Sequence, residues 1–206
     1  SAASDVYKRQ GRQTFNFSSA VAFVLAGQGV FVAKHGNRAV SSKSGSADVL
    51  EALGINLDIS PEESAVCVDE VGVGFFFAPK HYPFLRKVGP IRKSIGHRTI
   101  FNLLGPLINP ASAKHQLLGV SDSRFVRIHC EALQKLGSKS AVVVCSEDGL
   151  DEVSLTAKTK ISWLKDGQIE DLIFDPWQES GYSKCRLEDI QGGTPSENAL
   201  RLRQVL

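Results

Sequence analysis

The residues best suited to chemistry lie in one loop between Val32 and Gly54, where the chain reads VAKHGNRAVSSKSGSADVLEALG. Its serines and glycines let a ligand approach the backbone closely, and the helix expected after it directs a partial positive charge toward the loop. The loop is longer than most connections in α/β domains, which favours a binding role over a merely solvated connection. No P-loop pattern is present, so the residues indicate an anion, with phosphate as first candidate. The expected donors are Lys34, His35, Asn37, Arg38 and Lys43.

Two more polar groups could share this site. TFNFSS at 14–19 places Asn16, Ser18 and Ser19 at a helix start, where plain N-capping is the simpler interpretation of the segment alone. DGLDEVS at 148–154 presents an acidic turn after an apolar strand, and a hydrated turn is the alternative there. Parallel strands bring such turns to one sheet edge. Carboxylates beside a phosphate would repel it, so a bound divalent ion, best Mg²⁺, is the consistent solution.

Hydrophobic periodicity predicts the elements that must position these groups. Helices are expected from Ser18 to about 27, from a Ser46 N-cap to Gly54, after a capping box at Ser60, over 123–137, and from a Ser196 N-cap onward. Strands are expected at 30–33, 71–79, 116–120 and 140–145, with a hairpin over 159–174 whose turn is Asp166-Gly167. A linker is expected near 191–195. Because strands alternate with helices, we predict an α/β fold with parallel pairing.

Composition narrows the class of protein. The 206 residues are 42% apolar and 22% charged, which is ordinary for a globular protein. A net charge of +2 does not indicate a nucleic-acid or membrane surface. The four cysteines form no CxxC pair, so we interpret them as buried thiols of a reducing compartment. No apolar run is long enough to span a membrane and no signal peptide is evident, so a cytoplasmic location is expected.

The segments VAKHGNR, SSKSGSADVLEALG, GFFFAP, RTIFNLLGPLINP and DGLDEVS resemble the anthranilate phosphoribosyltransferase family of tryptophan biosynthesis, in order from about Thr14 to the end. The resemblance implies a nucleoside-phosphorylase-type (class IV phosphoribosyltransferase) domain, whose central mixed, mostly parallel sheet is flanked by helices. It implies transfer of the phosphoribosyl group of 5-phosphoribosyl 1-diphosphate to the amine of anthranilate, with Mg²⁺. The products are N-(5-phosphoribosyl)anthranilate and diphosphate, and the family is homodimeric.

The resemblance also assigns residues. The phosphoribosyl diphosphate side would be Asn16, Ser18, Ser19, Lys34 and Ser46, the anthranilate side His35, Asn37, Arg92, Gly105 and Pro106, and the metal side Ser18, Asp151 and Glu152. The implied catalysis is electrostatic, because negative charge develops on the departing diphosphate and needs no covalent nucleophile. A planar guanidinium at Arg92 suits the anthranilate carboxylate, and His35 could accept a proton late.

The chain departs from the family pattern in places. Ser19 stands where threonine is usual, and Tyr82 replaces the histidine usual after FAP. The GTGGD loop expected directly before Gly11 is absent, and DVYKRQ stands there. We therefore expect residues 1–10 to be foreign or disordered. Residues 11–206 are expected to form a partial α/β phosphoribosyltransferase domain, with 80–110 as a partly helical, ligand-facing connection.

We expect this chain to be a piece of the family's complete protein that lacks the N-terminal helical domain and the C-terminal segment. In line with this, the last predicted helix reaches Leu206 without a C-cap. We therefore expect the chain alone to be inactive. Two alternatives share the fold: a pyrimidine nucleoside phosphorylase and a nucleic-acid-binding paralogue. The KHGNR and FNLLGPLINP segments favour the transferase, and the low charge and intact acidic pair count against nucleic-acid binding.

Overall fold

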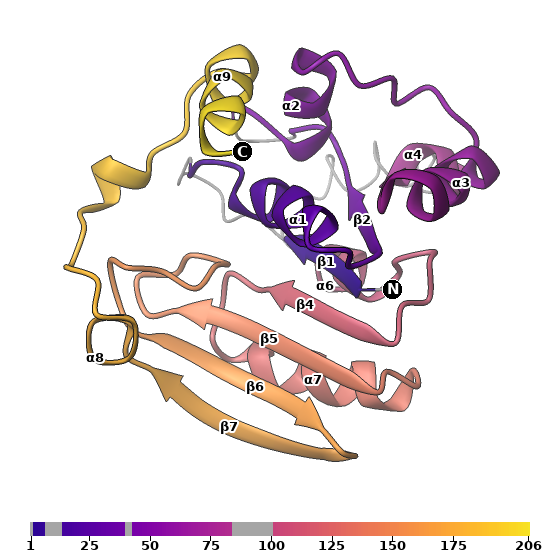
Figure 1. The fold of residues 1–206 in the computed structure, drawn as a ribbon. Coiled ribbons are helices and arrows are strands. Elements are labelled where there is room, and N and C mark those ends of the chain that lie inside the picture. Colours follow the sequence, from indigo (N-terminus) through magenta and orange to yellow (C-terminus); the bar gives the residue numbers. More distant parts are fainter. Residues whose placement is uncertain (1, 7–13, 40–42, 84–100) are drawn as a thin grey trace.

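A seven-stranded sheet in the order β3-β2-β1-β4-β5-β6-β7 forms the centre of the computed structural model (Figure 1). The structure describes residues 2–6, 14–39, 43–83 and 101–206. The first five strands pair in parallel, and the last two are antiparallel. The predicted central, mixed, mostly parallel sheet is confirmed. The strands are β1 (Ala2–Val6), β2 (Val32–Gly36), β3 (Val73–Phe77), β4 (His115–Gly119), β5 (Ser140–Ser146), β6 (Thr159–Lys165) and β7 (Gln168–Phe174).

The order of the strands changes direction at β1. β2 and β3 follow on one side of β1, whereas β4 and β5 follow on the other. Right-handed crossovers then place the connecting helices on opposite faces. α1 (Phe17–Gly27) contacts β1 and β2, and α7 (Phe125–Lys135) packs on β5 and β6 from the other side (Figure 1). Ligands of such sheets bind at the carboxyl ends of the strands, beside this change of direction.

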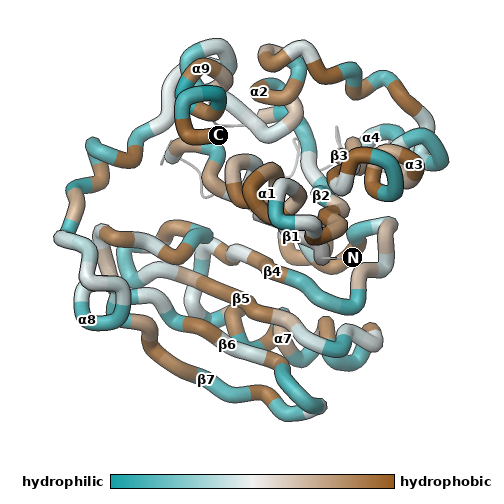
Figure 2. The backbone as a smooth tube through the Cα atoms, in the orientation of Figure 1, coloured by the Kyte–Doolittle hydropathy of each residue, from teal (hydrophilic) through white to brown (hydrophobic). Residues whose placement is uncertain are grey.

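Apolar residues fill the space between the sheet and the helices. Figure 2 shows apolar stretches along β5 and α1. The largest cluster joins Val126 and Leu133 of α7 to Leu118 and Val143 of the sheet, all nearly inaccessible to water. The remaining helices among the described residues are α2 (Ser46–Ala52), α3 (Pro61–Val71), α4 (Ala78–His81), α6 (Phe101–Leu104), η1 (Gly105–Leu107), α8 (Pro176–Ser180), η2 (Leu187–Ile190) and α9 (Pro195–Val205).

Two predictions from local chemistry are confirmed. Ser60 accepts a hydrogen bond from the Glu63 amide at 3.1 Å, and the Glu63 carboxylate accepts one from the Ser60 amide at 2.7 Å, so the capping box starts α3. In the β6–β7 turn both Asp166 and Gly167 have positive φ, 51° and 76°. A two-residue turn of that kind matches the twist of the paired strands.

Part of the N-terminal segment is ordered. Residues 1–10 were expected to be foreign or disordered, and Ala2–Val6 forms β1, a parallel partner of both β2 and β4, so disorder does not describe these five residues. The physical reason is that a strand between two others satisfies backbone groups on both of its sides, even without a strong apolar pattern. A foreign origin of residues 1–10 stays a prediction.

Three smaller predictions from the sequence are wrong. Gly45 rather than Ser46 is the N-cap of α2, and Thr194 rather than Ser196 caps α9 in a box with Glu197. The expected linker near 191–195 is tied down instead, because the Gln191 carbonyl accepts a hydrogen bond from Arg201 at 2.7 Å. Among the described residues, no helix is long and apolar enough to cross a membrane.

Candidate functional site

A lysine–serine contact joins β2 to the start of α1. The Lys34 Nζ donates a hydrogen bond to the Ser18 Oγ at 2.9 Å. Lys34 is only 3% exposed, and a buried ammonium is costly unless polar groups or an anion compensate it. The residue directly after Ser18 in α1, Ser19, is fully buried, and its hydroxyl has no hydrogen-bond partner among the described residues. The structure therefore assembles three of the residues predicted for the diphosphate.

Asn16 occupies the N-cap position of α1 but does not act as a side-chain cap. Its Oδ1 instead accepts a hydrogen bond from the Nδ2 of Asn198 in α9 at 3.0 Å, and both residues are buried. The simple N-capping interpretation of Asn16 is therefore wrong. Asn198 was missed from the sequence because 182 residues separate it from its partner. Its one local signal is a polar residue on the face of α9 that also carries Leu202.

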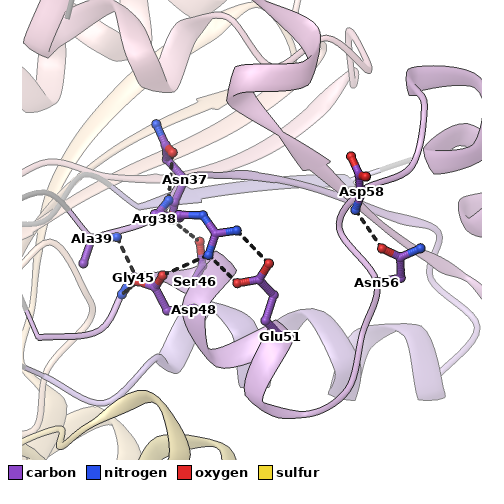
Figure 3. A network of polar contacts seen from close by, with 9 residues as sticks. All are labelled: Asn37, Arg38, Ala39, Gly45, Ser46, Asp48, Glu51, Asn56 and Asp58. Atoms are coloured by element: carbon purple, nitrogen blue, oxygen red, sulfur yellow. Dashed lines mark hydrogen bonds and ion pairs between the residues drawn. The ribbon is translucent and has the colours of Figure 1, made fainter. Parts of the chain in front are cut away.

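The loop after β2 is held by carboxylates of α2 (Figure 3). The Asp48 carboxylate accepts hydrogen bonds from the backbone amides of Ala39 at 2.9 Å and Gly45 at 2.8 Å. The Arg38 guanidinium forms a two-point ion pair with Glu51 and lies 3.6 Å from Asp48. Arg38 was predicted to face an anion, but its guanidinium is committed to carboxylates of the chain itself.

Ser46 and Asn37 lie together at the base of this loop (Figure 3). The Ser46 hydroxyl donates to the Asn37 carbonyl at 3.5 Å, and the Ala47 amide donates to the same oxygen at 3.3 Å. The Asn37 side-chain oxygen accepts from the Arg38 amide at 2.8 Å. Residues predicted for two different substrates thus meet where β2 ends and α2 begins.

His35 follows Lys34 within β2, so the two side chains point to opposite faces of the sheet. On its face, the His35 ring packs edge-on against Tyr82 with centroids 6.1 Å apart. The His81 ring lies nearby at a tilt against Phe76, and burial, with a smaller contribution from the charge of His35, lowers the pKa of His81. The predicted anthranilate side therefore carries aromatic side chains that favour a planar apolar ligand.

The segment with Gly105 and Pro106 is tied to its surroundings by side chains. A ring nitrogen of buried His129 lies 3.0 Å from the Leu103 carbonyl, and the Tyr82 hydroxyl donates to the Ile108 carbonyl. Asn109 donates to the Ala33 carbonyl of β2 at 3.1 Å. Sequence reasoning assigned no role to His129. The segment 105–106 is therefore fixed beside β2 on the side of Tyr82, whereas Arg92 lies outside the described residues.

The acidic turn follows β5, as predicted. Asp151 is buried and Glu152 is partly buried. The backbone of Asp151 lies against Gly119 at the end of β4, so closely that a Cβ at Gly119 would be 1.8 Å from the Asp151 carbonyl oxygen. Gly119 pairs with Val6 of β1. Asp151 is thus placed at the carboxyl edge next to the change of strand direction.

The donor chemistry of this turn fits magnesium. Asp151, Glu152 and Ser18 offer hard oxygen donors, and the described residues contain no cluster of three or more His, Cys, Asp or Glu that could hold a metal by itself. Mg²⁺ commonly binds through one or two carboxylates and completes its shell with water and phosphate oxygens. These residues therefore suit a magnesium ion that arrives with a phosphorylated ligand.

Comparison with known proteins identifies the family. A family model described as the a/b domain of the glycosyl transferase family matches residues 10–206. The chain belongs to this family. Among its curated relatives, the anthranilate phosphoribosyltransferase of Symbiobacterium thermophilum is 50% identical over 196 residues, or 95% of this chain and 57% of the relative. The anthranilate phosphoribosyltransferase of Bradyrhizobium sp. is 47% identical over 196 residues, which cover 95% of this chain and 58% of the relative. The chain thus spans somewhat more than half the length of these relatives.

Solved structures of glycosyl transferase relatives agree with this assignment. The anthranilate phosphoribosyltransferase of Thermus thermophilus superposes with a TM-score of 0.91 at 41% identity, covering 98% of this chain and 60% of that one. The Saccharomyces cerevisiae enzyme in complex with PRPP and Mg gives 0.87 at 28% identity, covering 98% and 56%. The resemblance and the fold class inferred from the sequence are confirmed.

Proposed function

We propose that this chain forms the phosphoribosyl-transferring part of an anthranilate phosphoribosyltransferase. The reaction is transfer of the phosphoribosyl group of 5-phosphoribosyl 1-diphosphate to the anthranilate amine, with release of diphosphate. The observation that carries the proposal is the buried Lys34 ammonium held at the start of α1 by Ser18. A fixed positive charge beside a helix N-terminus suits a phosphate group. The 50% identity to a curated enzyme of that activity supports the specific reaction.

The proposed chemistry divides between the two faces of β2. On the α1 face, Lys34, Ser18, Ser19 and the Asn16 turn stabilise negative charge as the diphosphate leaves. On the other face, His35 and Tyr82 with the 105–106 segment position the flat acceptor. An aromatic amine is already a usable nucleophile and needs no strong base. Holding this amine near the anomeric carbon therefore supplies much of the rate enhancement. His35 is the residue placed to accept the amine proton.

Magnesium is part of the proposal. Asp151 and Glu152, with the Ser18 hydroxyl, would hold the ion, which supplies positive charge to the diphosphate oxygens. The yeast relative was solved in complex with PRPP and Mg, which supports the use of this ion.

The decisive experiment measures anthranilate-dependent release of diphosphate in the presence of Mg²⁺. It is performed on this chain and on a protein in which the chain is joined to the remaining segments of the Symbiobacterium relative. We expect release by the joined protein that is lost in its Lys34→Met variant, and no release by the chain alone. A joined protein that folds but releases no diphosphate on addition of anthranilate refutes the proposal.

Two further parts of the proposal concern the whole protein: we propose that it is a homodimer and cytoplasmic. The four cysteines are free thiols, which suits a reducing compartment. Light scattering of the joined protein tests the first part, and a monomer at micromolar concentration would contradict it. Fractionation of the producing cells tests the second.

A further inference from the structure

A chain of hydrogen bonds leads from the backbone before α9 to the start of α1. The Gly193 amide donates to the Asn198 Oδ1 at 2.8 Å, and the Asn198 Nδ2 donates to the Asn16 Oδ1 at 3.0 Å. A backbone amide can only donate, so the atom of Asn198 that faces Gly193 must be its oxygen. The Asn198 atom that faces Asn16 is then the nitrogen, so Asn16 must accept this hydrogen bond with its side-chain oxygen.

This order decides which group Asn16 offers to a ligand. The oxygen and nitrogen of an amide lie on opposite sides of the Cγ, so the Asn16 Nδ2 faces away from Asn198. It makes no hydrogen bond to any other described residue. We propose that Asn198 is a positioning residue that fixes the Asn16 amide with its donor, rather than its acceptor, toward the diphosphate. This proposal rests on the proposed function, because it takes the Asn16 turn as the diphosphate site.

Burial gives the arrangement its specificity. Asn198 is 1% exposed and Asn16 is 3% exposed, so neither amide can exchange its partner for water. Turning the Asn16 amide over would place two oxygens face to face in a buried site, which costs the hydrogen bond and adds repulsion. The neighbouring buried Ser19 hydroxyl is a further donor at this helix start, and the Lys34 ammonium of β2 lies beside it through its contact with Ser18.

The test reverses the polarity of Asn198 without changing its size. In Asn198→Asp, one carboxylate oxygen still accepts from Gly193, but the other now requires a donor from Asn16, whose amide turns its oxygen outward. We expect the affinity for inorganic diphosphate with Mg²⁺, measured by titration calorimetry, to fall about tenfold or more. Asn198→Ala removes the constraint without reversing it, and we expect a loss of about threefold.

The added charge of aspartate could weaken anion binding by itself, so the same change is made in an Asn16→Ala background. If Asn198 acts through Asn16, the loss caused by Asn198→Asp shrinks to less than about twofold there. An equal loss in both backgrounds overturns the proposal. Melting temperatures of the four variants, compared with that of the unaltered chain, identify any that fails to fold.

If the variants unfold, a measurement on the unaltered chain tests the same proposal. In ¹⁵N NMR spectra, added diphosphate should shift the side-chain amide signals of Asn16 and leave those of Asn198 nearly unchanged. Unchanged Asn16 signals in a chain that binds diphosphate overturn the proposal. Normal diphosphate binding without anthranilate-dependent transfer by the joined protein would instead refute only the proposed function.

Discussion

Replacing Gly119 by alanine should separate β4 from the acidic turn. The added Cβ would stand 1.8 Å from the carbonyl oxygen of Asp151 and 2.7 Å from its carbonyl carbon, whereas ordinary contacts begin at 3.4 Å. The turn must therefore retreat by about 1.5 Å or more, and its backbone cannot simply rotate away as a flexible side chain can. The effect is steric, since the φ of Gly119 lies outside the left-handed region.

Overpacking of this kind costs about 1–3 kcal/mol. For a chain of this size each kcal/mol lowers the melting temperature by about 2–4 °C, so we expect a loss of roughly 2–12 °C. Displacement of Asp151 should also weaken the Mg²⁺-dependent part of diphosphate binding, because the carboxylate no longer lies where the ion would be shared. Scanning calorimetry and titrations with and without Mg²⁺ measure the two effects.

Gly27 provides the matched control. It is the last residue of α1, its φ is not positive, and an added Cβ would meet nothing within 4 Å. Gly27→Ala should therefore be neutral or stabilise the chain by up to about 1 kcal/mol, because alanine loses less backbone entropy on folding. If Gly119→Ala melts within 1 °C of the unaltered chain and of Gly27→Ala, Asp151 does not lie against the end of β4, and the placement of the acidic turn is refuted.

Three other predictions concern single side chains. Lys34→Met should weaken diphosphate binding about tenfold to a hundredfold by calorimetry. Its melting temperature should hold or rise because a buried charge is removed; a drop of many degrees would show that Lys34 is mainly structural. The pKa of Asp171 is lowered, first by the hydrogen bond from Ser162 and then by Arg127, so its stabilising effect is present above its ordinary value of 3.8 and lost as the pH falls below it. Unfolding of Asp171→Asn should therefore depend less on pH between 5 and 2, and an unchanged slope contradicts the assignment. Burial raises the pKa of the Cys130 thiol to about 11, so a thiol reagent at pH 8 should label it only after unfolding; fast labelling of the native chain would show the site to be open.

Local chemistry made much of the fold predictable from the sequence. The capping box at Ser60 and the turn at Asp166-Gly167 need only neighbours a few residues away, so their sequence signals suffice. Strand Ala2–Val6 lacks such a signal, because its place depends on two strands that the chain supplies much later. The N-caps lie at Gly45 and Thr194, one and two residues before the predicted Ser46 and Ser196. Helix ends are hard to predict to the residue because the terminal turns are irregular.

The candidate site was predictable in its residue types but not in its partners. A count of donors after β2 suggested that Arg38 faces an anion, yet Asp48 and Glu51 on the next helix already satisfy it. The contact of Lys34 with Ser18 needs the position of α1 over β2, and the contact of Asn16 with Asn198 needs the far end of the chain. Distant partners decide which polar residue remains available to a ligand.

The register of β2 is the feature on which the proposed division of the site depends most. Lys34 and His35 are adjacent and opposite β3 residues Phe75 and Phe76, so strand alternation sends one toward α1 and the other toward Tyr82. A slip of one residue would exchange the two faces and place an imidazole where the phosphate charge is expected. Gly36 secures this register, because a Cβ there would stand 2.4 Å from the Ser46 hydroxyl and 2.8 Å from the Phe75 ring. The close approach of the strand end to α2 therefore favours glycine at this position, with Lys34 on the proposed diphosphate side and His35 on the proposed acceptor side.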